Sequence, residues 1–265
     1  MTEDILKQIK QLPPLPESAM QIEAVYQNPD SNFNDMVKIL ETDPLLTADI
    51  LKAANSPLYG FSREINAISQ AVGLFGMGTI RGFALASIIK KSFALNLSPY
   101  GIDSDTFSIL SKRQHALVTA WCLRKEPKLL GILSPAAFLV EIGKVLISQH
   151  MLINNLQEQF KEALKELQDV EAAERAIVGV DTPEVSASIF EQWKFEPSLV
   201  NTIRHCLNPD KAQDADRKAA QILHVTRTAV PLNGVITEES LVAARELINK
   251  YSLDIESFEK AALLI

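Results

Sequence analysis

Hydrophobic positions along the chain recur at spacings of three and four residues, and the alternation expected of a strand is nearly absent. In residues 105–125, one side of a helix would carry Phe107, Ser111, His115, Val118 and Cys122. The same spacing predicts helices over residues 34–42, 45–55, 65–75, 79–95, 155–178, 198–207, 214–230, 238–250 and 255–264. The pattern therefore predicts an all-α protein with essentially no β-sheet.

Proline-containing pairs indicate where further helices begin. The DP pair at 43–44 and the TP pair at 182–183 each place a capping side chain directly before a proline. Proline suits the first turn of a helix, because the N–H that it lacks has no partner there. We expect the second of these helices to run through Trp193. The SP pair at 134–135 has the same order, so we expect it to open a helix that contains Glu141.

The composition of the 265 residues is that of an ordinary globular chain, with 47% hydrophobic and 22% charged residues. A net charge of −7 makes nucleic acid an unlikely partner. The N-terminus lacks the basic start and apolar core of a signal peptide. No apolar run is expected to reach the roughly 18 residues of a membrane span. Cys122 and Cys206 look like isolated reduced thiols, so we expect a cytoplasmic protein without membrane insertion.

Basic residues gather in the middle of the chain. Residues 63–128 contain nine basic and four acidic side chains, a balance of about +5 against −12 elsewhere. The simplest interpretation is a set of scattered solvated side chains. The alternative is a surface that docks an acidic partner or a phosphate.

A glutamate stands in the apolar run AAFLVEIGKVLI at residues 136–147. A carboxylate buried in such surroundings is costly unless it is paired. Glu141 could be a metal ligand, half of an ion pair or the remnant of a lost site. Lys144 lies three residues further on, so a local ion pair is its simplest partner.

The segment LKAANSPLYG at residues 51–60 should end a helix, because proline disfavours the α conformation in the residue before it. Polar side chains there can bond the exposed backbone groups, which suffices to explain the segment. The functional alternative is a groove for a protein partner or a small ligand. Its candidate residues are Asn55, Ser56, Tyr59, Arg63 and Arg81.

Several segments, in order, resemble the HDOD family over roughly residues 10–210. They are LPPLPESAMQI (12–22), DPLLTADILKAANSPLYG (43–60), AISQAVGLFGMGTIRGFALAS (67–87), RQHALVTAW (113–121), FLVEIGKVLI (138–147) and the stretch from 178 to 206. HDOD domains are relatives of HD-type metal-dependent phosphohydrolases. The family is usually described as a non-catalytic output or signalling module in bacteria.

The resemblance also assigns positions to the metal site of the HD enzymes. Where those enzymes have His-Asp-x-Gly-Lys, this chain has Val140-Glu141 and retains Gly143 and Lys144. The remaining positions are His115, Thr182, His205 and, near the last aspartate, Thr226 or a neighbour. Hydrolysis would need several convergent His and carboxylate ligands around a metal ion. Because the His-Asp pair is lost, we expect no metal, no cofactor and no catalytic residue.

The expected function is therefore a regulatory module that binds a signalling protein, with an anionic small ligand also possible. One alternative is a phosphohydrolase that uses His115, Glu141 and His205, with His224 as a further candidate ligand, on a nucleotide or cyclic dinucleotide. Another is a nucleotide sensor that binds phosphate without cleaving it. We expect two lobes: an N-terminal lobe over 1–125, and an HD-like lobe over 126–210 with helices of 211–265 packed on it. The oligomeric state is left open.

Overall fold

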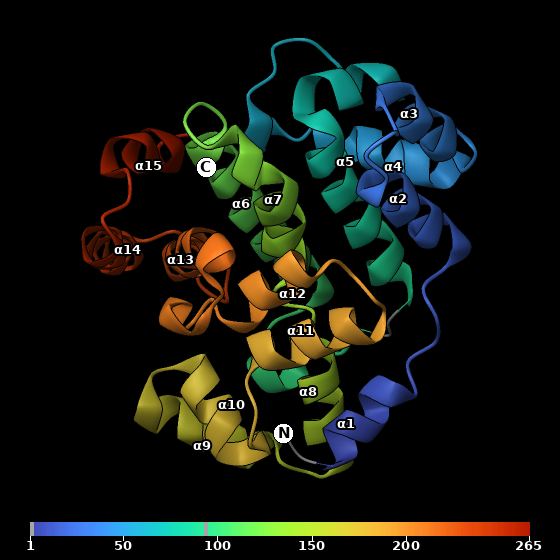
Figure 1. The fold of residues 1–265 in the computed structure, drawn as a ribbon. Coiled ribbons are helices and arrows are strands. Elements are labelled where there is room, and N and C mark those ends of the chain that lie inside the picture. The colour runs from blue at the N-terminus through green and yellow to red at the C-terminus, as the bar shows by residue number, and fades with distance from the viewer. Residues whose placement is uncertain (1–2, 93–94) are drawn as a thin grey trace.

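A computed structural model describes residues 3–92 and 95–265, and that part of the chain is helical without a β-strand (Figure 1). The helices are α1 (Glu3–Lys10), α2 (Glu17–Gln27), α3 (Phe33–Glu41), α4 (Pro44–Ala54), α5 (Ile68–Ser92), α6 (Ser104–Cys122), α7 (Leu130–Leu139), α8 (Gly143–Ile153), α9 (Gln157–Leu167), α10 (Val170–Val178), α11 (Thr182–Gln192), α12 (Pro197–Arg204), α13 (Asp214–Ala229), α14 (Glu238–Tyr251) and α15 (Ile255–Ala262). The short 3-10 turns are Pro57–Tyr59, Ser98–Tyr100, Pro127–Leu129 and Pro209–Lys211. The predicted all-α class is confirmed.

Two of the three predicted helix starts are correct. The Asp43 carboxylate accepts hydrogen bonds from the N–H groups of Leu45 and Leu46, so α4 begins at Pro44. Helix α11 begins at the predicted TP pair, but its cap is Asp181 and not Thr182, which is the first helical residue, with Pro183 next in the first turn. In both cases the cap satisfies N–H groups that the helix itself leaves without partners.

The third predicted start is wrong. The SP pair at 134–135 lies inside α7, and Glu141 lies in the turn at residues 140–142 between α7 and α8. Pro135 removes one intrahelical hydrogen bond, but Leu130, Leu133 and the helix residues after them are buried in the core. Their burial outweighs the lost bond, since tertiary packing supplies most of the stability of a helix in a protein.

Two other segments also differ from their predictions. The expected helices 65–75 and 79–95 form the single element α5, with a kink at Gly76, whose φ of +77° suits glycine. Residues 93–94 of that prediction lie outside the described residues. The expected helix over 155–178 is two helices, because Gln168 takes a left-handed φ of +51° and Asp169 caps α10.

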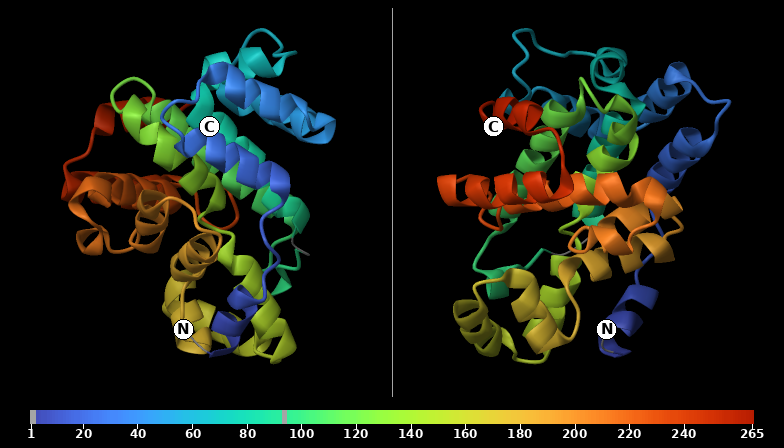
Figure 2. Two further views of the ribbon diagram at one scale, coloured as in Figure 1. Left: turned by 45° about the vertical axis from the view of Figure 1, so that its right-hand side comes forward. Right: turned by 60° about the vertical axis from the view of Figure 1, so that its left-hand side comes forward.

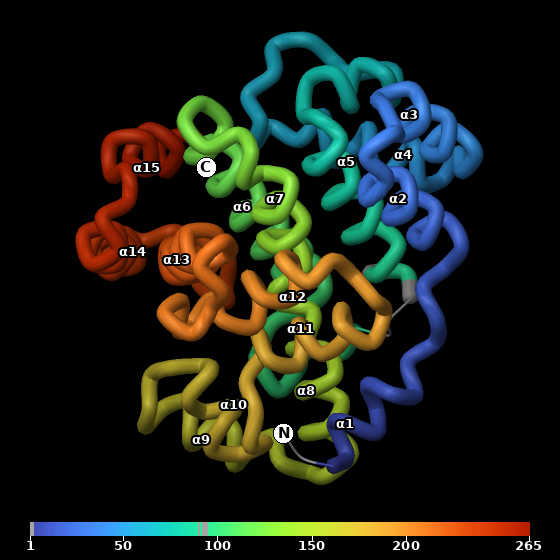
Figure 3. Tube along the Cα trace, viewed as in Figure 1, coloured from blue at the N-terminus to red at the C-terminus, as the bar shows by residue number. Residues whose placement is uncertain are grey.

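Helix α7 packs against both α5 and α6 at the centre of the molecule. Helices α2, α3 and α4 pack on α5, whereas α13 and α15 pack on α6 (Figure 2). The first helix lies apart from α2 and packs on α8 and α11, as the Cα trace shows (Figure 3). Helix α6 also contacts α7, α13 and α15 across residue 125, and the boundary between two lobes there stays a prediction.

Two segments are long and apolar enough to cross a membrane, contrary to the expectation from the sequence. They are Ile68–Ile89 and Pro127–Ile153, and 61% and 89% of their apolar windows are buried inside the protein. A helix surrounded by other helices needs apolar residues on all sides, so core helices can reach the same apolar content as a span.

Candidate functional site

Charged side chains from four elements meet at the turn between α7 and α8. We call this group the Glu141 cluster, and it consists of Glu141, Lys144, Glu171, Glu174 and Arg227. Its members come from the α7–α8 turn, α8, α10 and α13. Four of the five side chains are less than 10% exposed, and that of Glu171 is 18% exposed. The predicted ion pair of Glu141 is confirmed, but it belongs to a larger network.

Glu141 is held by two cations and an amide. The Arg227 guanidinium donates to both carboxylate oxygens, with Nε–Oε1 at 2.7 Å and an Nη–Oε2 distance of 3.2 Å. Lys144 Nζ lies 3.0 Å from Oε2, and the Gln114 amide donates to Oε1 at 3.1 Å. Arg227 also donates to Glu171 at 2.6 Å. A carboxylate bonded in this way offers little electron density to a metal ion.

The other side of the cluster is built around Glu174. This carboxylate accepts hydrogen bonds from the Thr182 N–H at 2.6 Å, the Thr182 hydroxyl at 2.5 Å and the Tyr100 hydroxyl at 2.8 Å. Lys144 donates to the Thr182 oxygen at 3.0 Å, and its ammonium lies 5.4 Å from the centre of the Tyr100 ring. The ammonium of Lys144 therefore lies between the two halves of the cluster.

The electrostatics favour ionised Glu141. Burial opposes its charge, but Arg227 and Lys144 outweigh burial and hold its pKa well below the usual value. Burial opposes the charge of Lys144, but the carboxylates of Glu141, Glu174 and Glu171 outweigh burial and raise its pKa above the usual value. Burial and the neighbouring Glu171 raise the pKa of Glu174. Three carboxyl groups therefore share two cations in this cluster.

Gly143 lets α8 and α11 approach closely at the cluster. A Cβ atom at Gly143 would lie 2.5 Å from the carbonyl oxygen of Thr182 and 2.9 Å from the Ser186 nitrogen. The Gly143 N–H donates to Ser186 Oγ at 2.8 Å, and that hydroxyl donates to the carbonyl of Val140 at 2.6 Å. The glycine and lysine retained from the HD pattern therefore keep structural roles.

His115 lies apart from the charged groups. Its Nδ1 is 2.6 Å from the Tyr59 hydroxyl and its Nε2 is 2.7 Å from Ser134 Oγ, while its ring stacks on Phe138 at 4.0 Å. Burial lowers the pKa of His115 to about 3, so the ring is neutral near pH 7. Both ring nitrogens are used within the protein, as expected of a hydrogen-bonded core histidine.

The remaining HD-type positions do not join the cluster, apart from Thr182. Val140 is fully buried, and the Thr226 hydroxyl donates to the carbonyl of Ile222 within α13. His205 is the half-exposed residue that ends α12, and burial and Arg204 lower its pKa. Cys206 is fully buried.

The donor groups therefore do not fit a metal ion. In the described part of the chain, no three His, Cys, Asp or Glu side chains come together in a way that could hold one. Lys144 and Arg227 instead supply the positive charge that neutralises the buried carboxylates. Burying a divalent ion here would place it against two fixed cations.

A pocket of about 260 Å³ opens above the cluster. Its lining includes Gln114, Glu171, His224 and Arg227, so the charged groups are reached from this side. The Gln114 carbonyl oxygen is buried, and the described residues provide no partner for it. His224 bonds the Tyr251 hydroxyl at 2.9 Å, and its pKa is lowered to about 4 by burial and Arg227.

Only some of the residues predicted to line a groove near the NSPLYG segment are exposed on the surface. The Asn55 amide donates to the Ile65 carbonyl at 2.8 Å and its oxygen accepts from the Ile65 N–H at 2.8 Å, so this side chain ties down the loop. Tyr59 points inward to His115, and Ser56 is half-buried. Arg63 is exposed, and the role of Asn55, Ser56 and Arg63 in partner binding stays a prediction.

Arg81 does not belong to that groove. Its side chain is fully buried and donates to both oxygens of Glu23, at 2.5 and 2.8 Å, and to Glu196 at 2.5 Å. Its guanidinium also lies 4.2 Å from the centre of the Tyr26 ring. The sequence pattern could not show this, because both carboxylates are distant along the chain. Arg81 connects α2 and α5 to the turn before α12.

The other basic residues of the middle segment are dispersed. Lys91 pairs with Asp49 at 2.7 Å, Arg113 bonds a backbone carbonyl near α14, and Lys125 pairs with Asp254 at 2.6 Å. The side chain of Lys90 lies outside the described residues. These contacts agree better with separate solvated side chains than with one docking surface.

The cluster also contains residues that the sequence reasoning missed. Arg227 lies four residues after Leu223 on the buried face of α13, and Glu174 lies between Val170 and Val178 on α10. The sequence did contain a signal for Arg227 and Glu174, because a charged residue on a predicted apolar face needs a partner. Tyr100 and Gln114, which donate hydrogen bonds to Glu174 and Glu141, have no comparable signal in the sequence.

Comparison with known proteins places this architecture in a family. A sequence model of the HDOD domain matches residues 12–209. The chain belongs to the HDOD family. The resemblance seen in the sequence over roughly residues 10–210 is thus confirmed. An uncharacterized protein of Treponema pallidum (strain Nichols) is 33% identical to this HDOD chain over 73 residues. That match covers 28% of the chain and 14% of the relative.

Solved structures share the fold of the HDOD chain over almost its whole length. A Shewanella amazonensis SB2B protein named "Putative phosphohydrolase" is 22% identical, with a TM-score of 0.71 over 99% of this chain and 94% of that one. A Marinobacter aquaeolei VT8 protein named "Putative signal transduction protein" is also 22% identical, with a TM-score of 0.70. The match covers 98% of this chain and 58% of that protein. At this identity the two structures show the fold alone.

Proposed function

We propose that this HDOD protein is a regulatory signal-transduction module, which acts in the cytoplasm by binding a protein partner and does not hydrolyse phosphoesters. The observation that carries the proposal is the buried ion pair between Glu141 and Arg227, whose guanidinium donates to both carboxylate oxygens at 2.7 and 3.2 Å. Glu141 stands where the family resemblance puts a ligand of the HD metal site. A guanidinium fixed on that carboxylate disfavours a metal ion by direct charge repulsion.

Two further observations support the same proposal. Lys144 Nζ also lies 3.0 Å from Glu141, and the two nitrogens of His115 are bonded to Tyr59 and Ser134. An HD-type hydrolase needs ligands that can leave their protein partners and converge on a metal. Here Glu141 and His115 would each first lose buried hydrogen bonds, which is costly.

The test compares metal content and hydrolysis. The protein should be purified, incubated with Mn²⁺, Fe²⁺, Zn²⁺ and Mg²⁺ in turn, desalted and analysed for bound metal. Hydrolysis of bis-p-nitrophenyl phosphate and of cyclic dinucleotides should be measured in the same samples. We expect no stoichiometric metal, no turnover and a melting temperature that chelators leave unchanged. Metal near one equivalent, together with a melting temperature that falls by several degrees on chelation, would support the hydrolase instead.

The partner surface is tested separately. The exposed loop that carries Arg63 is the remaining part of the groove predicted from the sequence. A candidate partner captured from the native host should bind the purified wild type more strongly than Arg63→Ala. The control is Lys128→Ala, which changes another exposed cation of the basic segment. If both variants lose the same affinity for the partner, the effect is one of general charge, and the partner does not bind at the groove.

A further inference from the structure

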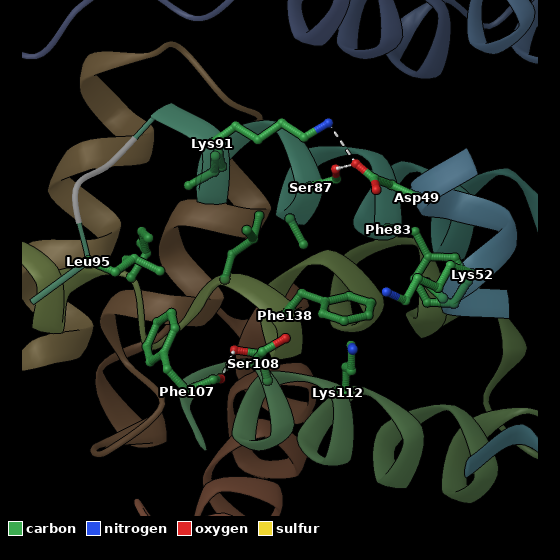
Figure 4. Close-up of a pocket in the computed structure, with 16 residues that line it drawn as sticks. Asp49, Lys52, Phe83, Ser87, Lys91, Leu95, Phe107, Ser108, Lys112 and Phe138 are labelled. Carbon is green, nitrogen blue, oxygen red and sulfur yellow. Dashed lines mark hydrogen bonds and ion pairs between the residues drawn. The ribbon is translucent and has the colours of Figure 1, made fainter. Parts of the chain in front are cut away.

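A second cavity lies between α4, α5 and α6, away from the Glu141 cluster. Its volume is about 450 Å³, which is within the range of small-molecule sites. It shares no lining residue with the 260 Å³ pocket above the cluster. Figure 4 shows side chains from α4, α5, α6 and α7 around it.

The inner wall of this cavity is apolar and preformed. Phe83 and Phe138 are 3% and 7% exposed, and their rings meet edge-on with centroids 5.3 Å apart. Ile89, Leu139 and Ile142 are buried and complete this wall. The wall therefore cannot collapse into the cavity without breaking core contacts.

Two of the three serine hydroxyls that line the cavity are already engaged. The Ser87 hydroxyl donates to Asp49 at 2.6 Å, and the Ser111 hydroxyl donates to the Phe107 carbonyl at 3.2 Å. A nucleobase has donors and acceptors around its edge, and several of them would be left without partners here. An aliphatic chain makes no such demand, so the wall is better suited to a hydrocarbon.

The mouth of the cavity is positively charged. Lys52, Lys91 and Lys112 line it, against the single acid Asp49, which gives +2 in a protein whose net charge is −7. Lys91 reaches Asp49 at 2.7 Å, whereas the ammonium groups of Lys52 and Lys112 lie on the Phe138 side of the cavity (Figure 4). The lysine ammonium is a compact point charge and lacks the planar set of donors by which arginine binds an anion with two parallel bonds. A single carboxylate group is therefore a suitable partner for it.

We propose that this cavity binds a free fatty carboxylate of medium length. The hydrocarbon chain lies against Phe83 and Phe138, and the carboxylate lies near Lys52. A volume of 450 Å³ equals roughly 15 water molecules at about 30 Å³ each, close to the number of non-hydrogen atoms in dodecanoate. Burial of the chain supplies affinity, and the lysines select the anionic head group. The inference rests on the cavity and is independent of the proposed signalling role.

The test titrates the full chain with dodecanoate, below its micelle concentration, by isothermal calorimetry. We expect one site per chain. Ala86 lines the cavity and is only half-buried, so Ala86→Phe should fill the cavity and abolish binding, whereas Ala86→Ser should bind as the wild type does. If Ala86→Phe does not fold, Ala53→Leu fills the same space from α4.

Charge selection is tested by Lys52→Gln against the control Lys128→Gln, an exposed lysine outside the cavity. Lys52→Gln should weaken binding roughly two- to fivefold, the range of an exposed ion pair, and Lys128→Gln should not change it. Dodecyltrimethylammonium should bind far more weakly than dodecanoate. Equal binding of the two amphiphiles would overturn the assignment of an anionic ligand.

Two other results would overturn the proposal. One is the absence of dodecanoate binding to the wild type, and the other is binding that the cavity-filling variants leave unchanged. Binding to phosphatidylglycerol vesicles tests whether the protein recognises a membrane surface instead of a free fatty acid. If the vesicles bind the protein through Lys52 while free dodecanoate does not, the lysines contact a lipid surface and the cavity is not a fatty-acid site.

Discussion

Arg227 donates its Nε–H to Glu141 at 2.7 Å across 86 residues of sequence, and both side chains are buried. With Lys144 on the other carboxylate oxygen, Glu141 compensates two cations at once. This relationship explains how a carboxylate can be buried in the apolar run of residues 136–147. Its role is to neutralise charge between α8, α10 and α13.

Glu141→Ala should therefore destabilise the protein strongly. Removing one partner of a buried ion pair strands the other charge, so the free energy of unfolding should fall by about 3–5 kcal/mol. Glu141→Gln should cost less, because the amide oxygen still accepts hydrogen bonds. Urea unfolding followed by circular dichroism measures both losses.

The control for Glu141 is Glu162→Ala, which removes an exposed carboxylate on α9. That change should lie within about 0.5 kcal/mol of the wild type. If Glu141→Ala is as mild as the control, the buried cluster does not exist in solution.

Gly143→Ala tests the close approach of α8 and α11. The added Cβ would lie 2.5 Å from the Thr182 carbonyl oxygen, so backbone must move and we expect a loss of about 1–3 kcal/mol. Gly73→Ala in α5 is the matched control, since its Cβ would meet only Phe33 at 3.8 Å. Replacing a helical glycine by alanine normally stabilises by roughly 0.5–1 kcal/mol. Thermal unfolding of the two variants should therefore shift in opposite directions.

The helices could be predicted from the sequence to a large extent, because their apolar stripes and their caps are local signals. The errors lie where tertiary packing overrides a local rule. Pro135 looked like a helix start, but the surrounding core keeps it inside α7. The break at Gln168 was hidden because a polar residue with a left-handed backbone has no unique signature.

The Glu141 cluster could be predicted only in part. Lys144 was identified because it is three residues from Glu141, whereas Arg227 and Glu174 reach the site through the fold. The sequence shows that a charge lies on an apolar face, but it does not show which opposite charge meets it. The same limit led to the wrong surface assignment of Arg81.

The stability of the protein should fall in mild acid because of His115. Burial lowers its pKa to about 3 in the folded state, against about 6.5 in the unfolded chain. Between these values the unfolded chain binds one more proton, so the free energy of unfolding rises with pH over this window. Lowering the pH from 7 to 5 should cost about 2 kcal/mol through this residue.

Urea unfolding of the wild type and His115→Gln at pH 7 and pH 5 checks this contribution. The variant is expected to be less stable at both values, but its difference between them should be smaller by up to about 2 kcal/mol. A pH difference that His115→Gln leaves unchanged would show that the imidazole is accessible to protons in the folded protein.

Arg81→Ala should destabilise the protein by about 3–5 kcal/mol, because it leaves Glu23 and Glu196 without their common partner. Arg81→Lys should recover only part of the loss. A single ammonium cannot reproduce three N–H donors to two carboxylates together with the contact to the Tyr26 ring. The exposed Arg63→Ala is the control and should stay within about 0.5 kcal/mol of the wild type in the same urea titration. The prediction is wrong if Arg81→Ala costs no more than the control and loses affinity for an anionic ligand. Arg81 would then be a surface residue without a structural role between α2, α5 and the turn before α12.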